Sequence, residues 1–273
     1  MQKRAERYRR QGKTVGLVPT MGALHEGHVA LIKRSVRQND ITVVSIFVNP
    51  AQFGPMEDFS KYPRAFKTDC EKVQQAGGAI VFYPPVKEIY PDSYQTYIIP
   101  GAISERLEGA ARPGHMRGVA TVCVKLFNIC KPDRAYFGQK DAQQLAMIRS
   151  VVRDLNLDLK IVRCPIVRTK TGIALSSRHS YLSEDDLKKA EVIHDSLKLA
   201  EKHVSEGEIS ILTIESQMRG LIETVAGATI EYIAFNRWDD LEEVAEMRGR
   251  VLVSLVVAIG GVRLLDNAII NCG

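Results

Sequence analysis

The stretch TVGLVPTMGALHEGHVALIKRSVRQNDITVVSIFV, residues 14–48, decides the fold. It opens on a short apolar, β-branched run over 14–20 and closes on a stronger one over 41–48, and both are typical of buried parallel strands. Between them, the apolar residues of 28–40 recur with near-helical spacing after a glycine-containing loop. The stretch therefore predicts one strand–helix–strand unit of a parallel sheet.

The alternation of strand and helix continues along the first two thirds of the chain. Helical spacing is predicted at about 62–76, at 119–130 and at 141–156, and short apolar runs predict strands at 79–84, 134–138 and 159–167. A Pro/Tyr-rich stretch up to about residue 100 reads as irregular. Alternating strands and helices of this kind predict a doubly wound parallel sheet.

The pattern changes from about Leu182 onward. Helices are predicted at 183–206 and about 209–226, followed by closely spaced strands at 228–235, 250–259 and 261–267. Strands joined by short turns indicate a small α+β domain. We expect an α/β protein with a Rossmann-like parallel sheet domain over 1–178 and a smaller C-terminal α+β domain over 179–273.

Composition restricts the class of protein. The 273 residues are 45% hydrophobic and 25% charged, which allows a full core, and the net charge of +5 is scattered rather than gathered in one block. The five cysteines form no C-x-x-C pair, so they read as reduced thiols of a cytoplasmic protein. No apolar run approaches the ~18 residues of a membrane span, and the basic start lacks the apolar stretch of a signal peptide. We expect neither a membrane nor a nucleic acid as partner.

The first cluster of chemically active side chains is PTMGALHEGH, residues 19–28, between the first predicted strand and helix. Open α/β sheets bind ligands where a parallel strand ends. Gly22 and Gly27 let the backbone approach a ligand, and the free N–H groups of a helix N-terminus favour phosphate. His25 and His28 can lie on one face and donate hydrogen bonds or protons to a leaving pyrophosphate. A merely polar loop is the alternative, which the strand–loop–helix context disfavours.

A second cluster, FGQKDAQQL at 137–145, runs from a predicted strand end into a helix. Lys140 is a mobile point charge suited to a phosphate. Asp141 can bind ribose hydroxyls or only cap the helix, and the two roles can coexist. Gln144 lies on the same helical face and offers a donor and an acceptor to an uncharged polar group.

A third cluster, LSSRHSYL at 175–182, lies at the predicted domain junction. Its two hydroxyls and its guanidinium make an anion clamp. Helix capping is the alternative role, but Ser183 with the acids after it already explains the next helix start. Ser176, Ser177 and Arg178 are therefore candidates for anion binding.

FVNPAQFG at 47–54 follows the second predicted strand and brings Asn49 and Gln52 to the same sheet edge. A purely conformational role for this turn is an equal alternative. For YPR at 62–64 and the Gly/Pro loop RLEGAARPGHMRG at 106–118, local structure explains the residues at least as well as catalysis does.

In this order, the segments closely resemble the pantothenate synthetases (pantoate–β-alanine ligases), a family of nucleotidyltransferases with HIGH-like signatures. The resemblance is carried by PTMGALHEGH, FVNPAQFG, YPR, RLEGAARPGHMRGV, KLFNICKPDRAYFGQKDAQQL, LSSRHSYL and the terminal RLLDN, which together cover nearly the whole chain. The His motif alone would indicate only the wider group, but the full set is specific to the family.

The resemblance implies a two-step ligation. Pantoate attacks the α-phosphorus of ATP to give pantoyl adenylate and pyrophosphate, and β-alanine then gives pantothenate and AMP. Magnesium would accompany ATP without a metal site built by the protein, and a homodimer is expected. The 1–178 domain would bind ATP and pantoate, with the 179–273 domain as a lid.

The site residues are carried over position by position. The catalytic candidates are His28, as proton donor, with His25, Lys140 and Arg178. The ATP-binding residues would be Met21, Gly22, Ala23, Leu24, His25, Glu26, Gly27, His28, Gly138, Gln139, Lys140, Asp141, Val167, Leu175, Ser176, Ser177 and Arg178. Gln52 and Gln144 would bind pantoate, and Gln52 would also lie near β-alanine.

The chain departs from the family pattern at Thr171, where an acid is usual, at His179, where an amide is usual, and at Met116, where Phe is usual. None of these removes a proposed donor. An adenylyltransferase acting on a phosphate ester is a competing hypothesis, but the amide-rich surroundings of Gln52 and Gln144 disfavour a phosphorylated acceptor. An RNA-binding module is a second one, and no basic stripe with interleaved aromatic residues supports it.

Overall fold

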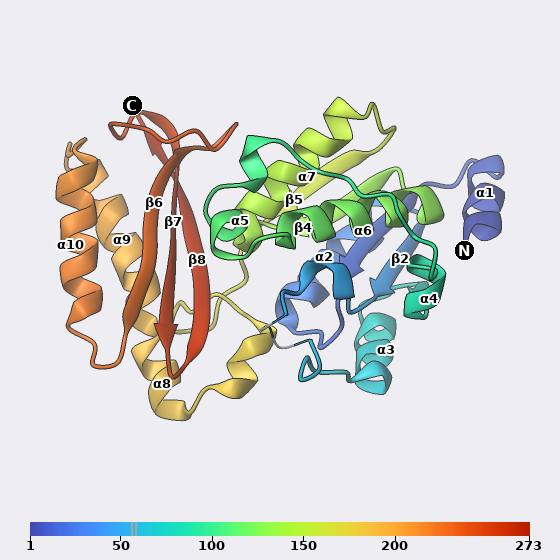
Figure 1. Cartoon of the computed structure of the whole chain (residues 1–273), viewed down its shortest axis with the longest axis horizontal. Helices are drawn as coiled ribbons and strands as arrows, with labels where there is room; N and C mark the ends of the chain where they lie inside the picture. Colours follow the sequence, from blue (N-terminus) through green and yellow to red (C-terminus); the bar gives the residue numbers. More distant parts are fainter. Residues whose placement is uncertain (56, 58) are drawn as a thin grey trace. The chain divides into compact units, whose positions relative to one another are not determined.

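Residues 14–48 fold as predicted in the computed structural model, which describes residues 1–55, 57 and 59–273 (Figure 1). β1 (Val15–Thr20) and β2 (Ile41–Ile46) pair in parallel along their full length, and α2 (Glu26–Gln38) connects them. By its internal contacts the chain forms two units. The first unit is Met1–Gln139 with Gln143–Pro165, and the second is Lys140–Ala142 with Ile166–Gly273.

The first unit is built on a parallel sheet in the order β3-β2-β1-β4-β5. Its further strands are β3 (Ile80–Phe82), β4 (Arg134–Gly138) and β5 (Lys160–Cys164). The chain winds outward from β1 to β3 and then returns to place β4 on the other side of β1. The carboxyl ends of β1 and β4 are therefore the topological switch point, where open α/β sheets bind ligands.

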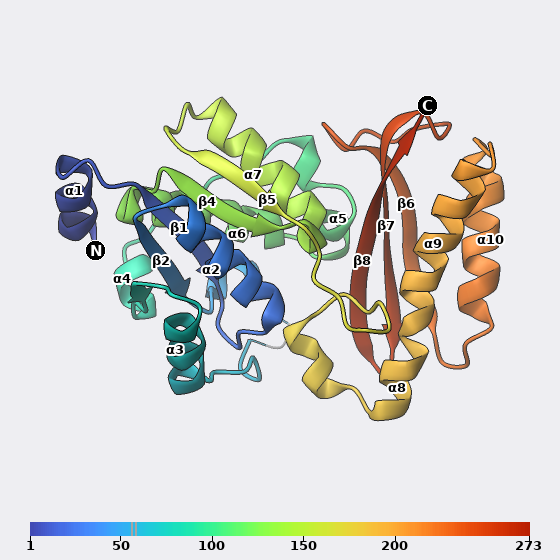
Figure 2. The ribbon, with the colours of Figure 1, turned by 180° about the vertical axis from the view of Figure 1, so that it is seen from behind.

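Helices cover both faces of this sheet. α2 lies over one face (Figure 2) and α6 over the other (Figure 1). The further helices of the first unit, with short 3-10 turns marked η, are α1 (Gln2–Arg10), η1 (Pro50–Gln52), α3 (Phe66–Gln75), α4 (Val86–Ile89), η2 (Ala102–Ser104), α5 (Glu108–Ala111), α6 (His115–Cys130), η3 (Gln139–Asp141) and α7 (Ala142–Asp154). Val18 and Val44 of the sheet and Ile32 of α2 are fully buried in the core between the helix and the sheet. Such burial is typical of a parallel sheet that is covered on both faces.

The second unit is the predicted α+β domain. Its antiparallel sheet has the order β6-β7-β8, and α9 and α10 lie side by side on one face (Figures 1 and 2). Its elements are η4 (Ser177–Tyr181), α8 (Glu184–Lys189), α9 (Glu191–Ser205), α10 (Ile211–Glu223), β6 (Thr229–Arg237), β7 (Gly249–Ile259) and β8 (Val262–Cys272). Leu197, Ile214, Met218 and Val253 form part of its own apolar core. The fold class predicted from the sequence is confirmed.

Some boundaries differ from the predicted ones. The helix predicted at 183–206 is divided into α8 and α9 at Ala190, whose small side chain is fully buried. β5 ends at Cys164 because Pro165 cannot donate to a strand ladder. The main segment of the second unit begins at Ile166, ahead of the predicted boundary at 178, because residues 166–178 pack within this unit.

All five cysteines are free thiols, as predicted. Within the described residues, no helix combines the length and the apolar character that a membrane crossing requires.

Candidate active site

The loop after β1 turns sharply before α2. Gly22 and Ala23 both have positive φ, +86° and +50°, and a non-glycine residue adopts this conformation only when its surroundings impose it. Asp69 of α3, 1% exposed, imposes it. Its Oδ2 accepts the N–H of Ala23 at 2.9 Å and its Oδ1 accepts that of Leu24 at 2.8 Å. These two charge-assisted hydrogen bonds fix the loop that leads to His25.

The two histidines of the loop are adjacent, as predicted, with ring centroids 4.1 Å apart. His25 is the N-cap of α2, and its Nδ1 accepts the N–H of Gly27 at 3.1 Å. His28 Nδ1 accepts the N–H of His25 at 3.3 Å. Gly27 is needed here because a Cβ would lie 2.8 Å from the His25 ring. The N–H groups of His25 and Gly27 are thus accepted by the two imidazoles, and phosphate binding at this helix N-terminus stays a prediction.

This capping arrangement decides which ring nitrogen carries the proton. An Nδ1 atom that accepts a backbone N–H bears no proton itself, so the neutral ring carries its proton on Nε2. In the neutral form, His25 and His28 therefore carry Nε2–H groups near the positive end of the α2 dipole. Such donors suit the negative charge of a phosphate chain.

Gln52 lies in η1, immediately after β2, and is oriented by Asn49. Asn49 Nδ2 donates to Gln52 Oε1 at 3.0 Å and to the main-chain O of Gly118 at 3.1 Å. Asn49 Oδ1 accepts from Ala51 N–H at 3.3 Å and from the Tyr90 hydroxyl at 2.9 Å. Burial raises the pKa of Tyr90, so this hydroxyl stays a donor. The hydrogen bonds of Asn49 are thus all made within the protein.

Because Asn49 holds the side-chain oxygen of Gln52, the amide NH₂ group of Gln52 is directed to the loop after β1. Gln52 Nε2 lies 3.1 Å from Sδ of Met21, the first residue of the histidine loop after β1. Beside this loop lies a hollow of about 310 Å³, at the size of a small-molecule site. Its lining includes Met21, Gly22 and Phe47, which follow the carboxyl ends of β1 and β2, and Asp69 of α3.

A second set of contacts fixes the main chain of Gln52. His115, the first residue of α6, lies with Nδ1 2.8 Å from the Gln52 carbonyl oxygen, so Nδ1 is the donor. Its Nε2 then accepts from Arg112 at 3.1 Å, and Arg112 forms a bidentate ion pair with Glu57 at 2.9 and 2.6 Å. Burial lowers the pKa of His115, and Arg112 lowers it further, which keeps the ring neutral.

The remaining predicted residues lie near the strand ends of the first unit or in the second unit. Gly138 ends β4, Gln139–Asp141 form η3, and Gln144 lies half-buried in the first turn of α7. In the second unit, Leu175 N–H bonds to Val167 O at 3.0 Å.

Ser176 is the N-cap of η4, which contains Ser177 and Arg178, and its Oγ accepts Arg178 N–H at 3.2 Å. Ser176 therefore has the capping role that was the alternative for this segment, but the element that it caps is η4, while Ser183 caps α8. Lys140, Ser176 and His179 line one narrow hollow of the second unit. Burial lowers the pKa of His179, and the charge of Lys140 lowers it further. His179 is therefore neutral at pH 7, like the amide usual at this position.

Sequence reasoning missed Asp69, and the signal was present. Asp69, Val73 and Ala76 share the buried stripe of the predicted helix, and an acid on an apolar stripe needs a partner. It also left His115 and Arg112 as local structure. In the structure, His115 bonds to the main chain of Gln52, and Arg112 bonds to His115.

The family model and highly similar relatives of this chain point to one family. The chain matches the model of the pantoate-beta-alanine ligase family over residues 1–269. The pantothenate synthetase of Caldicellulosiruptor saccharolyticus is 49% identical over 266 residues, which cover 97% of this chain and 95% of the relative. That of Acetivibrio thermocellus is 51% identical over 260 residues, which cover 95% and 92%.

Solved structures give the same result. Pantothenate synthetase from Thermus thermophilus has a TM-score of 0.90 at 39% identity, with 93% of this chain and 92% of that chain covered. Pantoate-beta-alanine ligase from Francisella tularensis, complexed with beta-gamma ATP and beta-alanine, has a TM-score of 0.79 at 34% identity, with 98% and 95% covered. The family model and these relatives span nearly the whole chain, which therefore belongs to the pantoate–β-alanine ligase family.

Proposed function

We propose that this chain joins pantoate and β-alanine at the expense of ATP, through a pantoyl-adenylate intermediate. A carboxylate oxygen of pantoate forms a bond to the α-phosphorus of ATP, and the bond to the β-phosphate oxygen breaks to release pyrophosphate. The amine of β-alanine then attacks the acyl carbon and loses a proton. The amide forms and AMP leaves.

The contact between Gln52 and Met21 carries this proposal. It places a neutral amide donor beside the loop whose two imidazoles carry Nε2–H donors. A hydroxy acid accepts hydrogen bonds from an amide NH₂ without needing a full positive charge, whereas a phosphorylated acceptor calls for arginine or lysine. Gln144 would complete the pantoate site, and Gln52 would also lie near β-alanine. The geometry favours a ligase over an adenylyltransferase.

His25 and His28 stabilise charge in this mechanism. With Nδ1 of each ring occupied by a backbone N–H, neither neutral ring offers Nδ1 as a base, and the Nε2–H groups donate to the triphosphate. His28 is the proposed proton donor to the departing pyrophosphate. The remaining residues of the loop, Met21–Leu24, Glu26 and Gly27, would hold ATP around this pair.

The second unit contributes a phosphate clamp. Lys140 and Arg178 supply positive charge, and Ser176 and Ser177 supply hydroxyl donors. Gly138, Gln139, Asp141, Val167 and Leu175 would complete the ATP site. Mg²⁺ would be held mainly by the phosphates, the usual mode for this ion. The lid role of the 179–273 domain, the homodimer and the cytoplasmic location remain predictions from the resemblance and the composition.

The experiment is a product assay on the full chain. Incubation with ATP, Mg²⁺, pantoate and β-alanine should give AMP and pantothenate in equal amounts. Without β-alanine, pyrophosphate should appear only when pantoate is present, and the adenylate should remain bound. Release of ADP, or pyrophosphate formation independent of pantoate, contradicts the proposal. Transfer of AMP to a phosphate ester would support the adenylyltransferase instead.

A further inference from the structure

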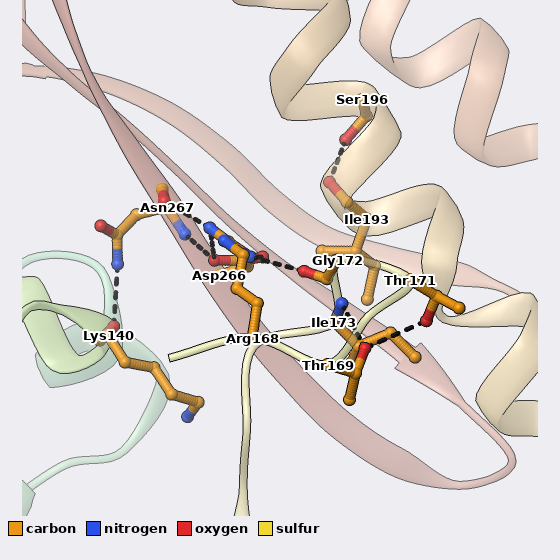
Figure 3. Close-up of polar contacts among 10 residues, drawn as sticks. All are labelled: Lys140, Arg168, Thr169, Thr171, Gly172, Ile173, Ile193, Ser196, Asp266 and Asn267. Carbon is orange, nitrogen blue, oxygen red and sulfur yellow. Dashed lines mark hydrogen bonds and ion pairs between the residues drawn. The ribbon is translucent and has the colours of Figure 1, made fainter. Parts of the chain in front are cut away.

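β8 carries two adjacent buried polar residues that the proposed site does not use. Asp266 and Asn267 are 2% and 1% exposed in the middle of the strand. A buried carboxylate destabilises a fold unless it is paired. Arg168 supplies the pair, with Nη1 and Nη2 at 2.5 and 2.9 Å from the two carboxylate oxygens (Figure 3). This bidentate contact fixes the orientation of the carboxylate.

The oriented carboxylate in turn fixes Asn267. Asp266 Oδ1 accepts the Asn267 N–H at 2.7 Å, and Arg168 Nη2 lies 3.4 Å from the Asn267 carbonyl oxygen. With its main chain held in this way, Asn267 directs its side-chain Nδ2 to the main-chain oxygen of Lys140, at 2.8 Å (Figure 3). This hydrogen bond attaches the main chain of the phosphate-binding lysine to β8.

The same arginine also fixes the hairpin that leads to the serine clamp. Arg168 Nη1 donates to the main-chain oxygen of Gly172 at 2.9 Å, inside the hairpin turn (Figure 3). The two arms of the hairpin join through Leu175 N–H and Val167 O at 3.0 Å, and the next residue is Ser176. One partly buried ion pair therefore supports both Lys140 and the segment that starts at Ser176.

The geometry points to Asn267 as a positioning residue for nucleotide binding, supported by Asp266 and Arg168. It acts by holding the main chain of Lys140 so that its ammonium group and the Ser176–Arg178 segment meet the same phosphates. A lysine side chain is a flexible four-carbon stem, so the place of its charge depends on a fixed main chain. This inference rests on the proposed function, because it assumes that Lys140 contacts ATP.

Replacing Asn267 tests the inference in the full-length enzyme. Asn267→Ala removes the donor to Lys140, and we expect the KM for ATP to rise about tenfold, as for one lost buried hydrogen bond. Asn267→Asp keeps the size but places a carboxylate oxygen against a carbonyl oxygen, so its effect should be larger. The KM for pantoate should stay within about twofold, because Gln52 is held by residues of the first unit.

Asn271 offers a matched control, because it is an exposed asparagine on the same strand. Asn271→Ala should leave both KM values and the unfolding midpoint unchanged. Urea unfolding of each variant separates lost positioning from lost folding. If Asn267→Asp does not fold, Asn267→Ala, which adds no charge to the core, carries the test.

A double-mutant cycle with Lys140→Ala gives a readout that a merely structural role would not produce. If Asn267 acts through Lys140, Asn267→Ala should add little to the ATP KM of the Lys140→Ala enzyme. An unchanged ATP KM in Asn267→Ala, an equal rise in both KM values, or full additivity in the cycle would each overturn the inference. A wild-type chain that makes no pantothenate would instead overturn the proposed function, so the two failures are distinguishable.

Discussion

Gly118 lies where α6 meets the turn that carries Gln52, and its replacement by alanine tests the proposed role of Gln52 in pantoate binding. A Cβ at Gly118 would lie 2.1 Å from the Ala51 oxygen, 2.4 Å from the Ala51 carbonyl carbon and 2.6 Å from Gln52 Cα. All three are main-chain atoms, which cannot rotate away as a side chain does. The Gly118 oxygen also accepts from Asn49 Nδ2 at 3.1 Å, so separation of α6 from η1 loosens the residue that orients Gln52.

The magnitude follows from this geometry. Real Cβ contacts essentially never fall below 3.0 Å, so α6 and η1 must separate by about 1 Å. A displacement of about 1 Å in a positioning group costs about 100-fold in rate, or about 2.7 kcal/mol of transition-state stabilisation. We therefore expect Gly118→Ala to lower kcat/KM for pantoate about 100-fold. The KM for ATP should change far less, since Asp69 holds the histidine loop separately.

The assay measures pyrophosphate release with pantoate and ATP varied separately, alongside urea unfolding. Overpacking at Gly118 should lower the free energy of unfolding by about 1–3 kcal/mol. Gly220→Ala is the matched control, because Gly220 is exposed within α10 and a Cβ there meets nothing within 4 Å. It should raise stability by up to about 1 kcal/mol and leave the kinetics unchanged. A folded Gly118→Ala enzyme with pantoate kcat/KM within about threefold of wild type would refute the reasoning.

Three further predictions follow from the first unit. His28→Ala should slow pantoate-dependent pyrophosphate release about 100-fold, because a charge-stabilising donor is lost. It should lower the free energy of unfolding by only about 1 kcal/mol, the cost of the lost cap. Near-normal release would remove His28 from the proposed catalytic residues. Asp69→Asn sets an amide donor against a backbone N–H donor. It should therefore lower the free energy of unfolding by about 2–3 kcal/mol and raise the KM for ATP. Asp158→Asn, at a side chain that is 96% exposed, should change neither quantity. Burial, and then Arg112, lowers the pKa of His115 from 6.5, so the unfolded chain binds the proton more readily than the folded one. The free energy of unfolding should therefore fall as the pH drops below about 6.5. In urea unfolding from pH 5 to 8, the free energy of unfolding should depend less steeply on pH for His115→Gln than for wild type, and an equal pH dependence would contradict this assignment.

The strands and helices could be predicted because their signals are local. Val15–Thr20 and Ile41–Ile46 are mostly apolar and almost wholly buried, and α2 between them shows one apolar stripe. The errors fall at element ends: β5 stops before Pro165, and the helix predicted at 183–206 is interrupted at Ala190. At both positions apolar residues continue beyond the interruption.

The site could be predicted only where its residues share a segment. His25 and His28 were placed together correctly because they lie three positions apart at the start of one helix. Asp69 reaches Leu24 across 45 residues, and Asn267 reaches Lys140 across 127. Spacing along one element carries no signal for such pairs, which only the tertiary fold brings together.

The residues that hold the site differ physically from the residues that perform the proposed chemistry. Asp69 holds two main-chain N–H groups and Asn267 holds a main-chain oxygen, so neither contact depends on the side chains of the loops. Replacing His28 should therefore change the rate much more than the stability. Replacing Asp69 should change both together, because the loop loses its conformation when its acceptor is removed. Comparing the rate loss of each variant with its loss of unfolding free energy thus distinguishes the residues that hold the site from the residues that take part in the proposed chemistry.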